Sequence, residues 1–310
     1  MKGRVIKSTG SWYQVLDDQD KIWECRLKGK FRQKGIKSTN PVAVGDWVDF
    51  EEEDTNGVIS HIHERNNYIV RKSVNLSKQS HIIASNIDRA FLIITLSDPP
   101  TSTGFIDRFL VSAEAYRIPV TLVFNKIDLY NEDDLEYMEA MRTIYKSIGY
   151  DSLTCSATEG IGIEELKEAL KEQVSVLSGH SGVGKSTLAN AIDTDLDLRT
   201  QEVSDSHHKG QHTTTFAEMF PLKFGGFIID TPGIKGFGMV DMTKEELTNY
   251  FPDFFAIKGD CKFHNCIHIN EPACAIKTAV ENNELAPHRY ASYLSLIAEM
   301  NDNEHFRQGH

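Results

Sequence analysis

The chain lacks any long apolar run, since none of its hydrophobic stretches reaches the roughly 18 residues that a membrane-spanning helix needs. Its first ten residues, MKGRVIKSTG, also lack the apolar core of a secretory signal peptide. Neither an internal repeat nor a low-complexity tract is present. We therefore expect a cytoplasmic protein without membrane contact, and the 310 residues allow two or three domains.

Cysteine is scarce, and three of the five cysteines lie in one short segment near the C-terminus. An odd number in this arrangement suits a metal site better than a disulfide framework. Together with one histidine they read C-x₄-C-x-H-x₅-C, and we predict one Zn²⁺ held by Cys261, Cys266, His268 and Cys274. His264 is the rival histidine ligand. Four protein ligands leave no position for water, so the predicted role is structural.

Positive charge is also in the minority, because the net charge is -12, but it is unevenly spread. Residues 1 to 80 hold 14 Lys/Arg against 11 Asp/Glu, a balance of +3, so the remainder carries -15. One stretch without any acidic residue contains Arg26, Lys28, Lys30, Arg32, Lys34 and Lys37. This stretch is either a solvated loop or a contact for an RNA backbone, and we favour the second.

The hydrophobic pattern divides the chain into three parts. Short alternating segments up to about residue 70 predict a small β-barrel. Apolar strands then alternate with helical patterns, which is typical of a mostly parallel sheet with helices on both faces. The strands are expected at 90–96, 120–124, 152–155, 174–177 and 227–229. We predict a multi-domain α/β protein with a barrel at 1–72, a nucleotide-binding domain at 73–245 and a helical zinc module at 246–310.

A phosphate-binding loop follows the fourth of these strands. The segment fits G-x-x-x-x-G-K-S/T and precedes a helical run, which is the context that this motif requires. Its glycines let backbone N–H groups curl around phosphate oxygens, while Lys185 neutralises phosphate charge and Ser186 binds Mg²⁺. The predicted contacts to nucleotide phosphates are Gly179, His180, Ser181, Gly182, Val183, Gly184, Lys185, Ser186 and Thr187.

Two further motifs select guanine. An N-K-x-D sequence, Asn125, Lys126, Ile127 and Asp128, follows the second strand, and the weaker S-A motif, Ser156 and Ala157, follows the third. The carboxylate of Asp128 would accept hydrogen bonds from two guanine donors that adenine lacks. Leaving that carboxylate unpaired is costly, so discrimination of about 10⁴-fold is expected. The nucleotide should therefore be GTP or GDP.

A D-x-x-G motif, Asp230 to Gly233, follows the last strand. Asp230 would hold Mg²⁺ through water, and the amide of Gly233 would contact the γ-phosphate. The polar stretch 200–215 is the candidate for the first switch, and we favour Thr214 over Thr213 as its Mg²⁺ ligand. The predicted Mg²⁺ site thus comprises Ser186, Thr214 and Asp230.

The order of these motifs is permuted. The guanine motifs precede the phosphate loop by about fifty and about twenty residues, and no second N-K-x-D follows Gly233. Joining the old ends and opening the chain elsewhere keeps all loops above one sheet. The second switch then leads directly into the C-terminal module, so we expect nucleotide state and module position to be coupled.

With these motifs the chain resembles the RsgA/YjeQ family of circularly permuted GTPases that depend on the small ribosomal subunit. The segments Cys25 to Lys30 and Val44 to Val48 are similar to that family's N-terminal OB-fold barrel. The resemblance implies RNA binding by the barrel, favours His268 over His264, and makes the small subunit the stimulating partner. Ile234 stands where many GTPases have glutamine, so we expect slow intrinsic turnover that a partner or another residue accelerates. The resemblance points to His212 as the residue that positions water, and the alternative is that His212 is a solvated switch residue.

We therefore predict a monomeric GTP hydrolase that binds the small ribosomal subunit and its rRNA and assists late maturation. Its catalytic residues would be His212, Lys185 and Thr214. An alternative is an RNA-binding assembly factor for which GTP is a structural ligand with negligible turnover. A metabolic P-loop kinase or ATPase is disfavoured by the N-K-x-D motif.

Overall fold

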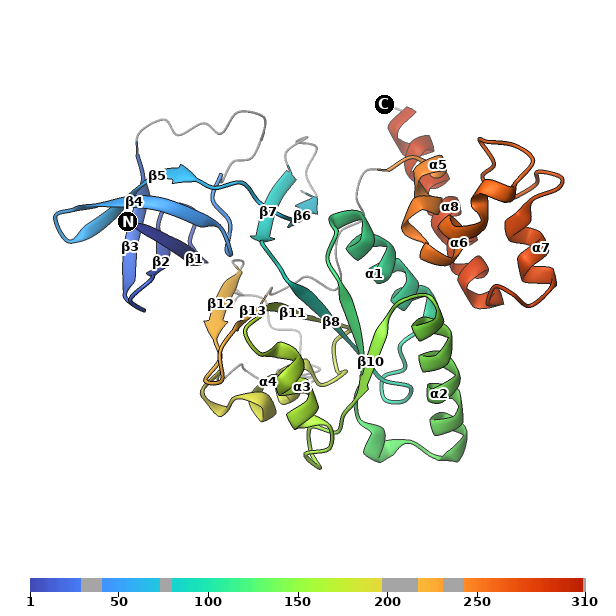
Figure 1. Ribbon diagram of the computed structural model, residues 1–310, viewed down its shortest axis with the longest axis horizontal. Coiled ribbons are helices and arrows are strands. Elements are labelled where there is room, and N and C mark those ends of the chain that lie inside the picture. The colour runs from blue at the N-terminus through green and yellow to red at the C-terminus, as the bar shows by residue number, and fades with distance from the viewer. Residues whose placement is uncertain (29–40, 73–79, 197–216, 231–241, 309–310) are drawn as a thin grey trace.

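A computed structural model describes residues 1–28, 41–72, 80–196, 217–230 and 242–308. A β-barrel at the N-terminus, a central sheet flanked by helices and a C-terminal group of helices follow one another along the chain (Figure 1). This arrangement confirms the predicted fold class. The boundaries after residues 72 and 245 stay predictions.

The barrel is built from five strands in the order β1-β2-β3-β5-β4, and β1 closes it by also pairing with β4. All neighbours are antiparallel except β3 and β5, which is the connectivity of an OB-fold. Alternate residues such as Val5, Val15, Phe50 and Ile59 are fully buried inside it. The strands are β1 (Lys2–Ser8), β2 (Tyr13–Asp17), β3 (Ile22–Leu27), β4 (Trp47–Glu53) and β5 (Asn56–Ile62).

A hairpin that the hydrophobic pattern did not predict follows the barrel. β6 (Tyr68–Lys72) pairs antiparallel with β7 (Ser80–Ser85). The polar stretch 71–80, which overlaps the ends of both strands, hides their short apolar cores from a pattern search. The hairpin lies between the barrel and the central sheet (Figure 1).

The central sheet has the order β10-β9-β8-β11-β13-β12, and its first five strands are parallel. β12 is antiparallel and pairs on its other side with β1 of the barrel, where Lys7 and Glu218 form an ion pair of 2.8 Å. Backbone pairing thus joins barrel and central sheet. The strands are β8 (Arg89–Ile94), β9 (Val120–Phe124), β10 (Asp151–Thr154), β11 (Val174–Ser178), β12 (Glu218–Pro221) and β13 (Phe227–Asp230).

Helices cover both faces of this sheet, as expected. On one face α1 (Thr103–Tyr116) and α2 (Glu132–Ser147) pack around Leu110, Leu122 and Tyr145. On the other, α3 (Ile163–Leu170) and α4 (Lys185–Ile192) pack around Leu166 and Leu188. Two one-turn 3₁₀ helices, η1 (Ile127–Leu129) and η2 (Thr194–Leu196), complete this region.

The C-terminal module is helical and rests on the outer side of α1 (Figure 1). Its core holds Leu247, Phe251, Phe254 and Tyr293, all fully buried. Its helices are α5 (Lys244–Leu247), η3 (Thr248–Tyr250), α6 (Pro252–Ile257), η4 (Lys258–Asp260), α7 (Ala275–Glu281) and α8 (Pro287–Gln308). Within the described residues, no helix combines the length and apolar character that crossing a membrane would need.

Buried charge fastens this module to the central domain. The guanidinium of Arg289 in α8 donates to Asp107 of α1 at 2.7 Å and to both carboxylate oxygens of Asp253 in α6 at 2.8 and 3.0 Å. Arg289 and Asp107 are 1% and 0% exposed. Burial alone would lower the pKa of Arg289, but the hydrogen bonds and the two carboxylates together raise it. The guanidinium of Arg289 therefore stays charged in this buried contact.

Candidate nucleotide site and metal centre

The phosphate loop connects β11 to α4 through backbone conformations that favour glycine. Gly179, Gly182 and Gly184 have φ of 146°, 85° and 91°, in the region that side chains disfavour. A Cβ at Gly184 would lie 2.5 Å from Asn125 Nδ2, and one at Gly179 would lie 2.4 Å from the Ile93 carbonyl oxygen. The loop is therefore packed closely against the ends of β8 and β9.

One hydrogen bond joins the phosphate loop to the guanine motif. The side-chain amide of Asn125, which is 1% exposed, donates to the carbonyl of Val183 at 2.8 Å. Its own Oδ1 atom is buried without a hydrogen-bond partner among the described residues. Segments 58 residues apart in the sequence thus meet at the carboxyl ends of parallel strands. A buried acceptor of this kind fits a ligand or a water molecule that supplies a donor.

The remaining residues of the guanine motifs surround the same edge of the sheet. Asp128 is exposed, so its carboxylate is accessible to a base. Lys126 donates to the carbonyl of Asp98 at 2.6 Å, and the N–H of Ile127 donates to the carbonyl of Cys155 at 3.3 Å. Ser156 is buried, and its hydroxyl accepts from the N–H of Glu159 at 3.2 Å. Ala157 is half-buried against the core under α3 and α4.

Lys185 begins α4, and its side chain folds back over the phosphate loop. Its ammonium donates to the carbonyls of Gly179 at 2.8 Å and His180 at 2.6 Å. Burial lowers the pKa of Lys185, and the carboxylate of Asp230 opposes part of that shift. A phosphate group would add the negative charge that favours the protonated form of this partly buried amine. Ser186 is half-buried, whereas Ser181 and Thr187 are exposed.

Two aromatic residues at this site were missed by the sequence reasoning. The hydroxyl of Tyr130 donates to the carbonyl of Asn125 and accepts from the N–H of Leu96, both at 2.9 Å, so it bridges the ends of β8 and β9. Burial raises the pKa of Tyr130 to about 12, which keeps the donor proton in place. Phe105 of α1 stacks on His180 with ring centroids 3.7 Å apart. Neither residue belongs to a short motif, so no local pattern could identify it.

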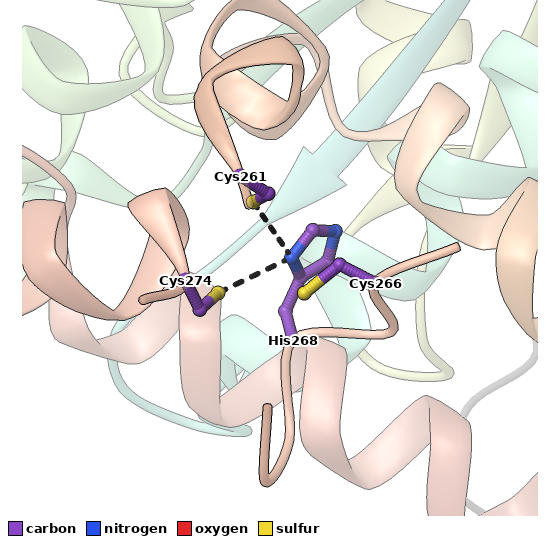
Figure 2. Close-up of side chains that lie close together, drawn as sticks. All are labelled: Cys261, Cys266, His268 and Cys274. Atoms are coloured by element: carbon purple, nitrogen blue, oxygen red, sulfur yellow. Dashed lines mark hydrogen bonds between the residues drawn. The ribbon is translucent and has the colours of Figure 1, made fainter. Parts of the chain in front are cut away.

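Figure 2 shows the second cluster, in which three cysteines and one histidine converge between α6 and α7. His268 Nδ1 lies 3.4 Å from Cys274 Sγ and 3.6 Å from Cys261 Sγ, and one ligand atom from each residue lies within 4.8 Å of the others. All four side chains are buried, while His264 is exposed. Burial raises the pKa of Cys266 to about 12, and the neighbouring Cys274 and Cys261 add to the rise while a backbone hydrogen bond from His268 opposes it. The buried Cys₃His group can bind one metal ion.

Glu271 organises the turn that carries His268, and the sequence reasoning did not single it out. Its carboxylate accepts from the backbone N–H groups of Ile267 and Ile269, each at 2.9 Å. Burial would raise the pKa of Glu271, but these backbone donors lower it. Tyr290 of α8 donates to the His268 carbonyl at 2.7 Å. The ligand loop is thus held by its own backbone and by the last helix.

Several predicted residues lie outside the described part of the chain: Lys30, Arg32, Lys34, Lys37, His212, Thr214 and Gly233. Of the basic stretch, the structure places Arg26 and Lys28. Both are exposed on the barrel, and they face acidic residues of β4. Arg26 lies 3.0 Å from Glu53, and Lys28 lies 4.0 Å from Glu51.

Comparison with known proteins gives a consistent result over the whole chain. Residues 62–240 match the family model "RsgA GTPase", and residues 2–59 match "RsgA N-terminal domain". The small ribosomal subunit biogenesis GTPase RsgA of Christiangramia forsetii is 58% identical over 98% of both chains. The protein of the same description from Bacteroides fragilis is 53% identical over 98% of this chain and 99% of its own.

Solved structures agree. YjeQ from Thermotoga maritima matches with a TM-score of 0.79 and 38% identity, covering 96% of this chain and 97% of that one. YloQ, described as a circularly permuted GTPase, matches with a TM-score of 0.76 and 32% identity, covering 97% and 95%.

Proposed function

Because this chain belongs to the RsgA GTPase family, we propose that it hydrolyses GTP to GDP and phosphate while bound to the small ribosomal subunit, and thereby assists late maturation of that subunit. The observation that carries the nucleotide assignment is the bond from Asn125 to Val183. This bond supports the proposal because it joins the loop that carries N-K-x-D to the loop that carries G-x-x-x-x-G-K-S/T. The relatives' descriptions supply the ribosomal part of the proposal.

In this site the loop from Gly179 to Thr187 receives the phosphates, and Lys185 neutralises their charge. Asp128, exposed in η1 just beyond β9, accepts from the guanine ring and its exocyclic amine. Ser156 and Ala157 border the base. The positive-φ glycines fit a nucleotide, and so does the Asn125 Oδ1 atom, which is buried without a hydrogen-bond partner among the described residues.

Ser186, Asp230 and Thr214 are the proposed ligands of Mg²⁺, with Asp230 acting through water. Bound with GTP, Mg²⁺ neutralises charge on the β- and γ-phosphates. Ser186 stands at the start of α4 and Asp230 at the end of β13. The carboxylate of Asp230 raises the pKa of Lys185, the residue before Ser186, which supports the view that Asp230 lies near the start of α4. Gly233 contacts the γ-phosphate, and His212 orients the attacking water.

Zn²⁺ is the proposed occupant of the cysteine cluster, since three thiolates and one imidazole form a donor set typical of structural zinc. Cys261, Cys266, His268 and Cys274 hold it, and Glu271 and Tyr290 keep the histidine loop in place. The ion then stabilises the module that α8 joins to α1.

RNA contacts are proposed for the barrel and the C-terminal module. On the barrel, Arg26 and Lys28 belong to the basic stretch that also contains Lys30, Arg32, Lys34 and Lys37. On the module, the ammonium of Lys258 lies 4.7 Å from the ring centroid of exposed Phe255, and that of Lys262 lies 5.6 Å from the ring centroid of exposed Phe263. Aromatic rings beside cations suit stacking on unpaired bases.

Hydrolysis of GTP and ATP by the purified protein, alone and with small ribosomal subunits, tests the function. Selective hydrolysis of GTP that the subunits accelerate is expected. Lys185→Ala should abolish it, whereas Lys171→Ala at the exposed C-terminal end of α3 should not. Asp128→Asn should exchange preference for GTP with preference for xanthosine triphosphate, because an amide donates where the carboxylate accepts.

The alternative, an RNA-binding assembly factor with GTP as a structural ligand, rests on Ile234, whose apolar side chain cannot orient water. Demonstrated subunit binding without any acceleration of hydrolysis would favour it. Both functions predict that Lys185→Ala loses GTP binding, so this variant does not separate them. The comparison of hydrolysis with and without small ribosomal subunits does.

A further inference from the structure

The outer face of the barrel carries three metal-binding side chains that neither the nucleotide site nor the cysteine cluster uses. Asp49 of β4 lies opposite His61 of β5 in the antiparallel ladder, and His63 follows just beyond β5. His63 Nε2 lies 3.0 Å from Asp49 Oδ1, and the two imidazole rings have centroids 5.1 Å apart. One ligand atom from each residue lies within 4.8 Å of the other two. The three donors therefore converge on one point.

The backbone holds this group in place. Asp49 and His61 are paired in register, and the N–H of His63 donates to the carbonyl of Trp47 at 2.9 Å. Val48 and Ile62, which alternate with these positions, are buried in the barrel core. Asp49 and His61 consequently start from paired strands and His63 from a backbone bonded to β4, so little backbone entropy would be lost on binding an ion.

The group is also accessible. His61 is exposed, and the side chains of His63 and Asp49 are 35% and 43% exposed. An ion pair between Asp49 and His63 alone would be an ordinary surface contact of little stabilising value. Such an ion pair does not account for the second imidazole, that of His61, beside the same carboxylate.

We propose that Asp49, His61 and His63 form a second metal site, which takes a divalent first-row transition ion such as Zn²⁺. Two imidazoles and one carboxylate suit zinc and its neighbours in the series better than Mg²⁺ or Ca²⁺, which prefer oxygen ligands. Three protein ligands leave a coordination position open to solvent, unlike the four-ligand Cys₃His cluster.

Two positive groups near Asp49 limit the affinity. The N-terminal amine donates to the carbonyl of Phe50 at 2.8 Å, and Lys2 lies opposite Asp49 on β1. The Lys2 ammonium is 5.1 Å from the centroid of the Trp47 ring, over which it lies. The second site should therefore bind more weakly than the cysteine cluster and exchange its ion with solution.

Calorimetric titration of tag-free, full-length protein with ZnCl₂, after its resident metal has been quantified by mass spectrometry, tests the proposal. We expect one further equivalent to bind. His61→Gln and His63→Gln should each weaken that binding at least about tenfold, because even outer-shell changes at metal sites cost this much. Glu64→Gln, an exposed neighbour outside the group, should bind as the parent protein does.

Asp49→Asn provides a variant of nearly identical shape that has lost the anionic ligand, and melting curves of all variants report whether the barrel is intact. Weakened binding by folded His61→Gln, His63→Gln and Asp49→Asn proteins supports the site. Absence of a further equivalent in the parent protein, or its persistence in all three variants, would overturn the proposal. The latter result would assign the ion to other histidines of the chain.

Discussion

Replacing Arg289 should destabilise the protein far more than removing an ordinary surface charge. Arg289→Met keeps most of the side-chain volume but removes the cation that faces Asp107 and Asp253. Asp253 is 11% exposed and can gain some water, whereas Asp107 is fully buried. In the variant, Asp107 retains the hydroxyl of Tyr145 at 2.8 Å as its hydrogen-bond donor, and its Oδ2 atom already has no partner among the described residues.

Breaking a buried ion pair from one side costs about 3–5 kcal/mol, because the remaining charge stays desolvated. For a folded unit of about 150 to 250 residues, about 4 kcal/mol corresponds to a loss of roughly 10 °C in melting temperature. Arg289→Met combined with Asp107→Asn removes the stranded charge and should recover about half of the loss. Non-additivity of this kind is the expected sign of direct contact.

Thermal unfolding followed by circular dichroism measures these differences, with limited proteolysis to show whether α8 detaches first. Lys171→Met, which removes a helix-surface pair with Glu168 at 3.7 Å, is the matched control and should stay within about 0.5 kcal/mol of the parent. A melting temperature of Arg289→Met within about 2 °C of the parent, or a double variant as unstable as the sum of both changes, would contradict a stabilising buried contact between Arg289 and Asp107.

Three further outcomes are expected. Gly184→Ala adds a Cβ 2.5 Å from Asn125 Nδ2 at a φ of 91° and should weaken GDP binding strongly. Gly104→Ala, whose Cβ would meet nothing within 4 Å, should leave GDP binding unchanged. Titration with fluorescent GDP measures both affinities, and equal values would contradict close packing at Gly184. Tyr130→Phe removes the hydroxyl that bonds the Leu96 N–H and the Asn125 carbonyl, and it should raise the Kd for GDP about tenfold. Tyr137→Phe, at an exposed position, should leave the Kd unchanged. An unaltered Kd in Tyr130→Phe would exclude Tyr130 as a positioning residue. Burial lowers the pKa of His288, so its neutral form contributes stability that is complete above about pH 6.5 and is lost as the pH falls through the folded-state pKa. Melting temperatures at pH 7.5 and 5.5 should therefore differ less for His288→Asn than for the parent, and an equal difference would argue against this assignment.

Local features of the sequence predicted much of the fold. β9 has the expected bounds, and β8, β10, β11 and β13 lie within a few residues of the expected strands, because continuous apolar runs mark buried parallel strands. β12 was not predicted, since Glu218–Pro221 is a short segment with a charged and a proline end. It owes its place to pairing with β13 and with the barrel.

The candidate site divides in the same way. The phosphate loop, the N-K-x-D motif and the cysteine spacing each lie in a short stretch of the chain, so local patterns predicted their presence and their permuted order. Which histidine faces the cysteines was decided by folding, because a backbone at φ 59° turns His268 inward while His264 stays exposed. The contact of Arg289 with Asp107 spans 182 residues, and that of Asn125 with Val183 spans 58. Such contacts depend on how sheet, barrel and helices pack together, which no local spacing encodes.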